Sequence, residues 1–157
     1  MQDLILIPPT IDYADQIMDF RREFLSSGSS MDGTSGLRRC ESAEEWLELV
    51  EMAKTRETCP AEWVPAGALI SVRKRDNKLI GMVNIRYEDN AEILRWAGHI
   101  GYSVRPSERG KGYAKAQLAL ALDFCRERGM KRVMISCDRE NPASARTGIN
   151  SDTSVMS

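Results

Sequence analysis

Residues 105–114, Arg-Pro-Ser-Glu-Arg-Gly-Lys-Gly-Tyr-Ala, constrain the fold of this chain more than any other stretch. The apolar run 99–104 precedes them, and the amphipathic segment 115–128 follows them. This order predicts a strand, a tight glycine-bearing turn and a helix. Such a turn directs several backbone N–H groups at one point, at the positive end of the helix. The sequence therefore predicts a binding site for a phosphate or pyrophosphate group.

The spacing around the glycines excludes two common phosphate-binding motifs. Lys111 is followed by Gly112, so the motif G-x-x-x-x-G-K-[ST] does not occur. The chain also lacks G-x-G-x-x-G, which marks dinucleotide-binding folds. Glycine at positions 110 and 112 would let a ligand approach the backbone closely, because no side chain stands in the way. The alternative is a plain strand-to-helix turn that binds nothing.

Composition and charge exclude several classes of protein. The 157 residues predict one domain, and 22 basic against 23 acidic side chains leave a net charge of −1. This balance offers no attraction to nucleic acid or to an anionic membrane surface. No run approaches ~18 apolar residues, and the first residues lack the basic start of a signal peptide. The four cysteines show no C-x-x-C spacing, so we expect a cytoplasmic protein with reduced thiols and no metal.

Apolar patterning predicts a strand at 4–7 and then two helices. Thr10 is expected to cap the first helix. The apolar stripe of this helix is expected to start at its first residue and to comprise Ile11, Ala14, Met18 and Leu25, widened by Ile17, Phe20 and Phe24. The Ser- and Gly-rich segment 26–36 predicts a loop, either a flap on the substrate side or a simple connection. Ser42 and Glu45 fit a capping box for the second helix.

The second half of the chain is rich in strand patterns. The runs 68–74 and 79–87 predict an antiparallel hairpin. The run 99–104 predicts a further strand, and a helix follows the glycine turn. A strand at 133–137 is then expected to lie beside the 99–104 strand, which completes a strand–helix–strand unit.

The residues of the glycine turn resemble those of a known family. Arg109, Gly112 and Ala114 stand in the pattern Arg-x-x-Gly-x-Ala, which is similar to the acyl-CoA pyrophosphate loop of the GCN5-related N-acetyltransferases (GNAT). The preceding strand, the following helix and a later strand that leads to Asn141 match as well. The resemblance covers about residues 3–146. It implies an α/β (α+β) fold, with a mixed, mostly antiparallel sheet flanked by helices.

The resemblance implies a site for acetyl-CoA. The backbone N–H groups of residues 110–114 would hold the pyrophosphate, and the strand ending at Val104 would pair with the pantetheine arm. An Asn after the last predicted strand contacts this arm in the family. The residues expected to bind the cofactor are therefore Ser103, Val104, Arg109, Gly110, Lys111, Gly112, Tyr113, Ala114, Asn141 and Ser144.

The catalytic groups are harder to place from sequence. The resemblance implies that the N–H of Val104 donates to the thioester oxygen as the tetrahedral intermediate forms. An attacking amine has a pKa near ~10.4, so a base that removes its proton is useful. The candidates are Glu88 and His99, with Asp89 and Glu92 as further carboxylates near Glu88. Each has a plainer interpretation, as a solvated carboxylate or as a structural histidine.

The C-terminal end departs from the family pattern. The family continues after Ala145 with a helix that carries a Tyr, the general acid for the leaving thiolate, and with a strand pair that closes the sheet. The tail 147–157 has no Tyr and no strand pattern, so we expect one domain at 1–146 followed by an irregular polar tail. The chain could be a truncated or frame-shifted product, a natural short variant, or a form without efficient catalysis. An open sheet edge would favour a homo-oligomer.

The resemblance implies an N-acetyltransferase that moves an acetyl group from acetyl-CoA to a primary amine of a small molecule. The amine would attack directly in a ternary complex. The alternative is a non-catalytic or impaired acyl-CoA-binding domain, because the closing strands and the general-acid Tyr are not found. The partners are then acetyl-CoA and an unidentified amine, with no nucleic acid and no membrane.

Overall fold

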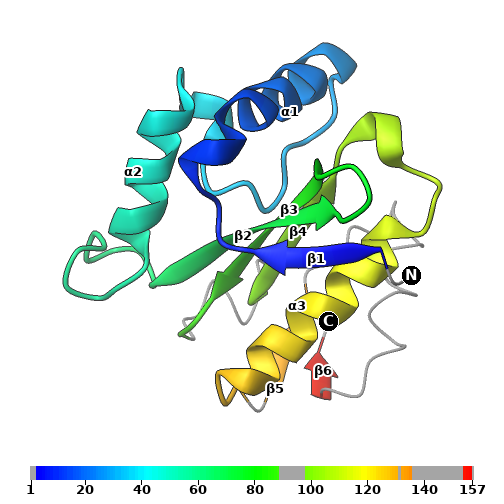
Figure 1. The fold of residues 1–157 in the computed structure, drawn as a ribbon. Coiled ribbons are helices and arrows are strands. Elements are labelled where there is room, and N and C mark those ends of the chain that lie inside the picture. The colour runs from blue at the N-terminus through cyan, green and yellow to red at the C-terminus, as the bar shows by residue number, and fades with distance from the viewer. Residues whose placement is uncertain (1–2, 89–97, 131, 136–153, 157) are drawn as a thin grey trace.

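A computed structural model describes the chain at residues 3–88, 98–130, 132–135 and 154–156. Its centre is an antiparallel sheet with the strand order β1-β2-β3-β4 (Figure 1). The strands of this sheet are β1 (Leu4–Ile7), β2 (Ala66–Arg73), β3 (Lys78–Arg86) and β4 (Ile100–Val104). The helices are α1 (Ala14–Ser27) and α2 (Ala43–Ala53) on one face of the sheet, and α3 (Tyr113–Glu127) on the other.

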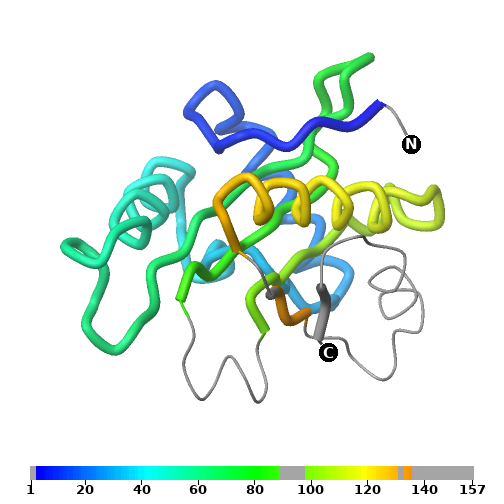
Figure 2. The backbone as a smooth tube through the Cα atoms, turned by 90° about the horizontal axis from the view of Figure 1, so that it is seen from below, coloured from blue at the N-terminus to red at the C-terminus, as the bar shows by residue number. Residues whose placement is uncertain are grey.

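Alternation along the strands builds a core on each face of the sheet. On the face covered by α1 and α2, Met82 packs with Phe20 and Trp46. On the opposite face, Val83 packs with Leu118 of α3 and with other apolar side chains. Seen from below, α3 crosses in front of the strands (Figure 2). The predicted hairpin 68–74 and 79–87 is confirmed, because β2 and β3 pair antiparallel with an irregularity between Ser71 and Val72.

The first helix differs from its prediction. Residues Ile11–Tyr13 form a 3-10 turn, the α-helix begins at Ala14, and the Thr10 side chain makes no capping hydrogen bond. The expected stripe is wrong at both ends, because Ile11 is 53% exposed and Leu25 is 41% exposed. The fully buried side chains are Ile17, Phe20 and Phe24. The 3-10 turn has a different period from the α-helix, so Ile11 leaves the face that continues in α1.

The second helix begins as predicted. The Ser42 hydroxyl accepts a hydrogen bond from the backbone N–H of Glu45 at 3.1 Å. The Glu45 carboxylate accepts from the backbone N–H of Glu41 at 3.3 Å, one residue before the position that a capping box would use. In the described part of the chain, no helix is long and apolar enough to cross a membrane.

The strand after α3 lies beside β4, as predicted, but only where β4 begins. The strand β5 spans Arg132–Met134, and the backbone N–H of His99 donates to the Met134 carbonyl at 2.6 Å. Ile135 forms bridges with Gly98 and Ile100. The remainder of the predicted strand, 136–137, lies outside the described residues. β5 and β4 are thus in contact at one end.

One strand appears in the tail, where the sequence predicted irregular structure. The strand β6 (Ser154–Met156) pairs in parallel with β5, with Val155 opposite Val133. Three residues are too few for an alternating pattern to be recognised, and the pairing uses the backbone of a distant segment. Asn141 and Ser144, which were predicted to bind the cofactor, lie outside the described residues.

Candidate functional site

The turn between β4 and α3 has the geometry of an anion site. A short 3-10 helix (Pro106–Glu108) follows β4, and Gly110 and Gly112 then take left-handed conformations with φ of +78° and +86°. Gly112 is the N-cap of α3, and no side chain caps this end of the helix in the described structure. The first turn of α3 also contains no acidic residue. Its N–H groups are therefore placed to receive an anionic ligand.

The register of β4 shows which backbone groups of the strand face outward. The N–H of Arg105 donates to the Ile80 carbonyl at 2.9 Å, and the N–H of Arg86 donates to the His99 carbonyl at 2.7 Å. In an antiparallel ladder, alternate residues turn their backbone groups toward the partner strand. Ser103 is an even number of positions from both His99 and Arg105, so its backbone N–H and carbonyl also face β3. Val104 lies opposite Gly81 with its N–H and carbonyl directed away from β3.

Near Val104, no strand among the described residues pairs with the outward edge of β4. Within the described ranges, β5 and its neighbour Ile135 reach this edge only as far as Ile100. The backbone of Tyr102 has the same direction as that of Val104, because the two residues are two positions apart. Tyr102 was missed by the sequence reasoning. A count of every second residue back from Val104 would have identified it.

The Arg109 side chain lies between β4 and the loop after α1. Its Nε donates to the Val104 carbonyl at 3.1 Å, and one terminal nitrogen donates to the Ser29 hydroxyl at 3.3 Å. The guanidinium carbon lies 5.5 Å from the centre of the Phe24 ring. The geometry thus joins three parts of the site: the glycine turn, the end of β4 and the loop at Ser29.

Two other residues of the predicted pyrophosphate loop also have protein partners. The Nζ of Lys111 donates to the Glu108 carboxylate at 3.1 Å. The buried hydroxyl of Tyr113 accepts from Arg73 at 3.1 Å. Ala114 packs against the apolar cluster that contains Val104 and Tyr113. Tyr113 and Ala114 therefore attach this loop to the sheet, whereas Lys111 is bound within the turn.

The loop after α1 is fastened to the sheet beside this site. A Cβ on Gly33, whose φ is +67°, would overlap the backbone carbonyl group of Gly101 in β4. Ser35 accepts from the Asn84 amide at 2.7 Å. The indole N–H of Trp46 donates to the Thr34 carbonyl at 2.8 Å. The loop begins at Gly28, after the end of α1 at Ser27, and not at position 26 as predicted.

The candidate bases lie far from the end of β4. Glu88 is paired with Arg56 at 2.7 Å, and both side chains are about half exposed. His99 is buried, and its Nδ1 accepts from the Met134 backbone N–H at 2.9 Å. His99 and Val104 are five strand positions apart, which corresponds to roughly 17 Å. The structure therefore does not bring His99 or Glu88 next to Val104. Asp89 and Glu92 lie outside the described residues.

Ser103 carries an unusual hydroxyl group. The residue is 8% exposed, and its Oγ is the one buried side-chain oxygen or nitrogen in the described structure that has no hydrogen-bond partner. Its side chain points to the face that α1 and α2 cover, since it shares this face with Met82. The Ser103 carbonyl accepts from the Gln117 amide of α3 at 3.2 Å.

The sequence matches the family described as an acetyltransferase (GNAT) domain over residues 3–148. This match spans most of the chain, so the chain belongs to the GNAT acetyltransferase family. The resemblance inferred from the glycine turn is confirmed. A search of curated proteins finds no match to this chain.

Solved structures share the fold of this chain. A putative ribosomal-protein-serine acetyltransferase from Vibrio cholerae is 23% identical with a TM-score of 0.60, and the match covers 95% of this chain and 78% of that one. RimL, a ribosomal L7/L12 α-N-protein acetyltransferase in complex with coenzyme A, is 16% identical with a TM-score of 0.62 and the same coverages. Glucosamine-6-phosphate N-acetyltransferase from Arabidopsis thaliana is 16% identical with a TM-score of 0.56, covering 98% and 96%. The predicted α+β GNAT fold is thus confirmed.

Proposed function

We propose that this chain transfers an acetyl group from acetyl-CoA to a primary amine. One observation carries the proposal: the uncapped start of α3, preceded by Gly110 and Gly112 in left-handed conformations, follows directly on a strand whose outer edge carries Val104. The helix start suits a pyrophosphate, and the strand edge suits an amide-bearing arm that pairs like an extra strand. The coenzyme A bound to RimL, a member of the same fold, supports this choice of ligand.

In the proposed reaction, acetyl-CoA supplies a thioester carbonyl that can be attacked. The nitrogen of the neutral amine forms a bond to the carbonyl carbon, and the carbon–sulfur bond breaks. The Val104 N–H donates a hydrogen bond to the oxygen on which negative charge develops. The amine loses one proton, and the thiolate of coenzyme A takes up one proton as it leaves. Both substrates are bound together, so no covalent enzyme intermediate is needed.

Positioning of the two substrates is proposed to be the main source of rate enhancement. Glu88 is ion-paired with Arg56, and His99 is separated from Val104 by the length of β4. Proton removal by either side chain would require a relay of water molecules along β4. Well-oriented reactants depend less on a base, because they have already lost their translational and rotational entropy on binding. Glu88 and His99 remain candidate bases in this proposal.

We propose a small molecule as the acceptor. The named activities of similar structures include both ribosomal-protein acetylation and glucosamine-6-phosphate acetylation. The fastening of the loop at Gly33 and Ser35 supports a small acceptor, because it places a fixed wall beside β4. A peptide N-terminus is the competing acceptor. The rest of the peptide would then need an open path past this loop.

The experiment combines binding and turnover. Isothermal titration with acetyl-CoA measures binding, and release of free thiol is followed with a panel of amino acids, polyamines, amino sugars and short peptides. We expect binding and thiol release with at least one small amine. Binding without thiol release for any amine would support the non-catalytic alternative. No binding of acetyl-CoA would overturn the proposal.

A further inference from the structure

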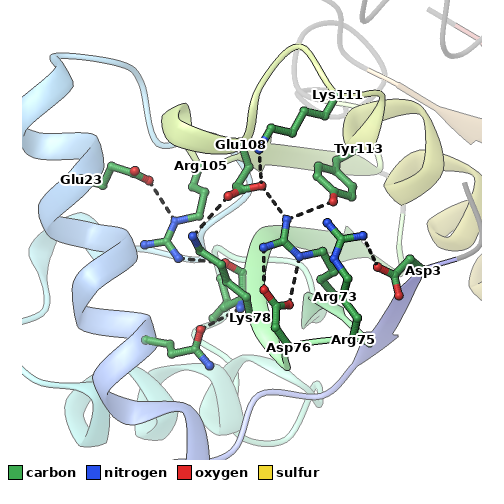
Figure 3. A network of polar contacts seen from close by, with 12 residues as sticks. Asp3, Glu23, Arg73, Arg75, Asp76, Lys78, Arg105, Glu108, Lys111 and Tyr113 are labelled. Carbon is green, nitrogen blue, oxygen red and sulfur yellow. Dashed lines mark hydrogen bonds and ion pairs between the residues drawn. The ribbon is translucent and has the colours of Figure 1, made fainter.

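The turn before α3 contains a buried carboxylate that the proposed reaction does not use. Glu108 is 5% exposed and lies at the end of the 3-10 helix, directly before Arg109. Its carboxylate accepts hydrogen bonds from three cationic side chains (Figure 3). They are Arg73 at 2.7 Å, Lys78 at 3.2 Å and Lys111 at 3.1 Å. A buried carboxylate with this many partners is fixed in position.

The three cations come from two different parts of the chain. Arg73 ends β2 and Lys78 begins β3, so both belong to the hairpin that these strands form. Lys111 stands in the turn itself, between the two left-handed glycines. Glu108 therefore connects the glycine turn to the β2–β3 hairpin. The sequence separation between Arg73 and Glu108 is 35 residues, so this connection is a tertiary contact.

The partners of Arg73 extend the network to the first residue of α3. Arg73 donates to both carboxylate oxygens of Asp76, at 2.9 and 2.7 Å, and to the Tyr113 hydroxyl at 3.1 Å. Tyr113 begins α3, directly after the N-cap Gly112. Arg73 thus holds Glu108 and Tyr113 at once, and these residues flank the glycine turn.

The charges of the network suit a site next to an anion. Arg73, Lys78 and Lys111 carry three positive charges, whereas Glu108 and Asp76 carry two negative ones. Burial raises the pKa of Glu108, but hydrogen bonds from Lys111, Lys78 and Arg73 outweigh this effect and lower it to about 2. The carboxylate is therefore ionised at neutral pH. One positive charge remains in excess beside the start of α3.

A second tie holds the other end of the same turn. The guanidinium of the buried Arg105 donates to Asp19 at 2.7 Å and to Glu23 at 2.9 Å, both in α1. It also donates to the Leu79 carbonyl at 3.0 Å. The turn is thus fixed to α1 at its start and to the hairpin at Glu108, so the N–H groups that follow have little freedom to reorient.

We propose that Glu108 is a positioning residue for the acetyl-CoA site, an inference that rests on the proposed function. Glu108 holds the glycine turn on the β2–β3 hairpin so that the N–H groups at the start of α3 are already directed at the pyrophosphate. It does not touch the ligand. Its effect on binding comes from pre-organisation, because a turn that is fixed in advance loses less conformational freedom when the ligand binds.

Two roles for Glu108 predict opposite effects of its removal. If Glu108 acted only as a negative charge near an anion site, its neutralisation would leave Lys111 free for the phosphates and binding would become tighter. If Glu108 positions the turn, its neutralisation leaves Arg73, Lys78 and Lys111 to repel one another and binding becomes weaker. The direction of the change therefore distinguishes the two roles.

The test compares Glu108→Gln with Glu51→Gln. The first variant keeps the size of the side chain and removes its charge. The second makes the same change at a carboxylate of α2 that is 75% exposed and paired with Lys54, outside the Arg73 network. We expect Glu108→Gln to raise the dissociation constant for coenzyme A about tenfold. Its KM for acetyl-CoA should rise likewise with kcat nearly unchanged, and Glu51→Gln should stay within about twofold.

Two further variants keep the test decisive. Glu108→Asp retains the charge and should recover part of the affinity, which a general loss of folding would not do. Lys78→Gln removes a hairpin partner whose side chain is 36% exposed and should weaken coenzyme A binding about threefold, even if Glu108→Gln does not fold. Unchanged or tighter binding of coenzyme A by Glu108→Gln would overturn the inference. If Glu108→Gln does not fold, unchanged binding by Lys78→Gln would overturn it. Failure of the wild-type protein to bind coenzyme A would instead reject the proposed function, and the inference with it.

Discussion

The Nε of Arg109 donates a hydrogen bond of 3.1 Å to the carbonyl oxygen of Val104. The resemblance implied that Arg109 binds the cofactor. In the structure its guanidinium joins the glycine turn to the strand residue whose N–H is proposed to stabilise the reacting oxygen. The same group reaches Ser29 in the loop after α1. Arg109 therefore links the proposed cofactor side of the site to the proposed acceptor side.

Replacement of Arg109 should affect both substrates. We expect Arg109→Ala to raise the KM values for acetyl-CoA and for the amine, each by about tenfold, because the contacts to Val104 and Ser29 are both lost. Arg109→Lys should not restore them, since a single ammonium group cannot reproduce the fork of a guanidinium. Steady-state kinetics measures the effect, with the exposed Arg22→Ala as control. A change in the KM for acetyl-CoA alone would contradict the link to the acceptor side.

The conformation of Gly110 predicts a local effect on binding. Gly110 and Gly129 have φ values of +78° and +82°, and a Cβ at either position would meet nothing within 4 Å. Alanine at either position should therefore cost about 1–2 kcal/mol of stability through backbone strain alone. Only Gly110→Ala is expected to weaken coenzyme A binding, because Gly129 lies at the far end of α3. Titration calorimetry and urea unfolding of both variants separate the two effects; equal affinities would argue against the turn as the binding site.

The contact between Gly33 and Gly101 predicts a second glycine effect. Gly33→Ala should destabilise the fold by about 2 kcal/mol more than the backbone strain alone, because its Cβ would overlap the backbone of β4. Gly28→Ala is the matched control, since Gly28 is also left-handed, with a φ of +71°, but has open space around it. We expect Gly33→Ala, and not Gly28→Ala, to raise the KM for the amine. Similar unfolding midpoints for the two variants would show that the loop is not fastened at Gly33.

The carboxylates of the Arg73 network predict a loss of stability in acid. The pKa of Glu108 is lowered to about 2, and hydrogen bonds from Arg73 lower the pKa of Asp76 to about 2 as well. Both values lie below the ordinary ~4.3 and ~3.9 of unfolded chains. The stabilisation is therefore complete above about pH 5 and is lost as the pH falls from there toward 2. Urea unfolding from pH 7 to pH 2.5 measures this decline. Glu108→Gln should show a shallower decline, and an unchanged slope would contradict this origin.

The unpartnered hydroxyl of Ser103 predicts an unusual tolerance to substitution. Ser103→Ala should leave stability unchanged or slightly higher, because it removes a buried polar group without breaking a hydrogen bond. Ser71→Ala is the comparison, since the buried Ser71 hydroxyl is hydrogen-bonded to Gln117. Its removal should cost about 1–2 kcal/mol. Thermal and urea unfolding measure both changes; a marked loss for Ser103→Ala would mean that its Oγ has a partner in solution.

Much of the fold could be predicted because it depends on local patterns. The left-handed glycines before α3, the Ser42 cap of α2 and the hairpin of β2 and β3 each follow from residues that are close in sequence. The first helix shows the limit of such patterns. A 3-10 turn before Ala14 removed Ile11 from the expected apolar stripe of the helix. The spacing of apolar residues does not predict this change of helical period.

The sequence by itself determined the strand, the glycine turn and the helix that make up the proposed anion site, because turn conformation depends mainly on the residues in the turn. Only the tertiary structure decided how the groups of that proposed site are directed. The register of β4 against Gly81 turns the backbone of Val104 outward. The contacts of Glu108 with Arg73 and of Arg109 with Ser29 commit their side chains to holding the turn. These contacts join segments that are far apart in the chain, so they follow from the packing of the whole domain and from no local spacing.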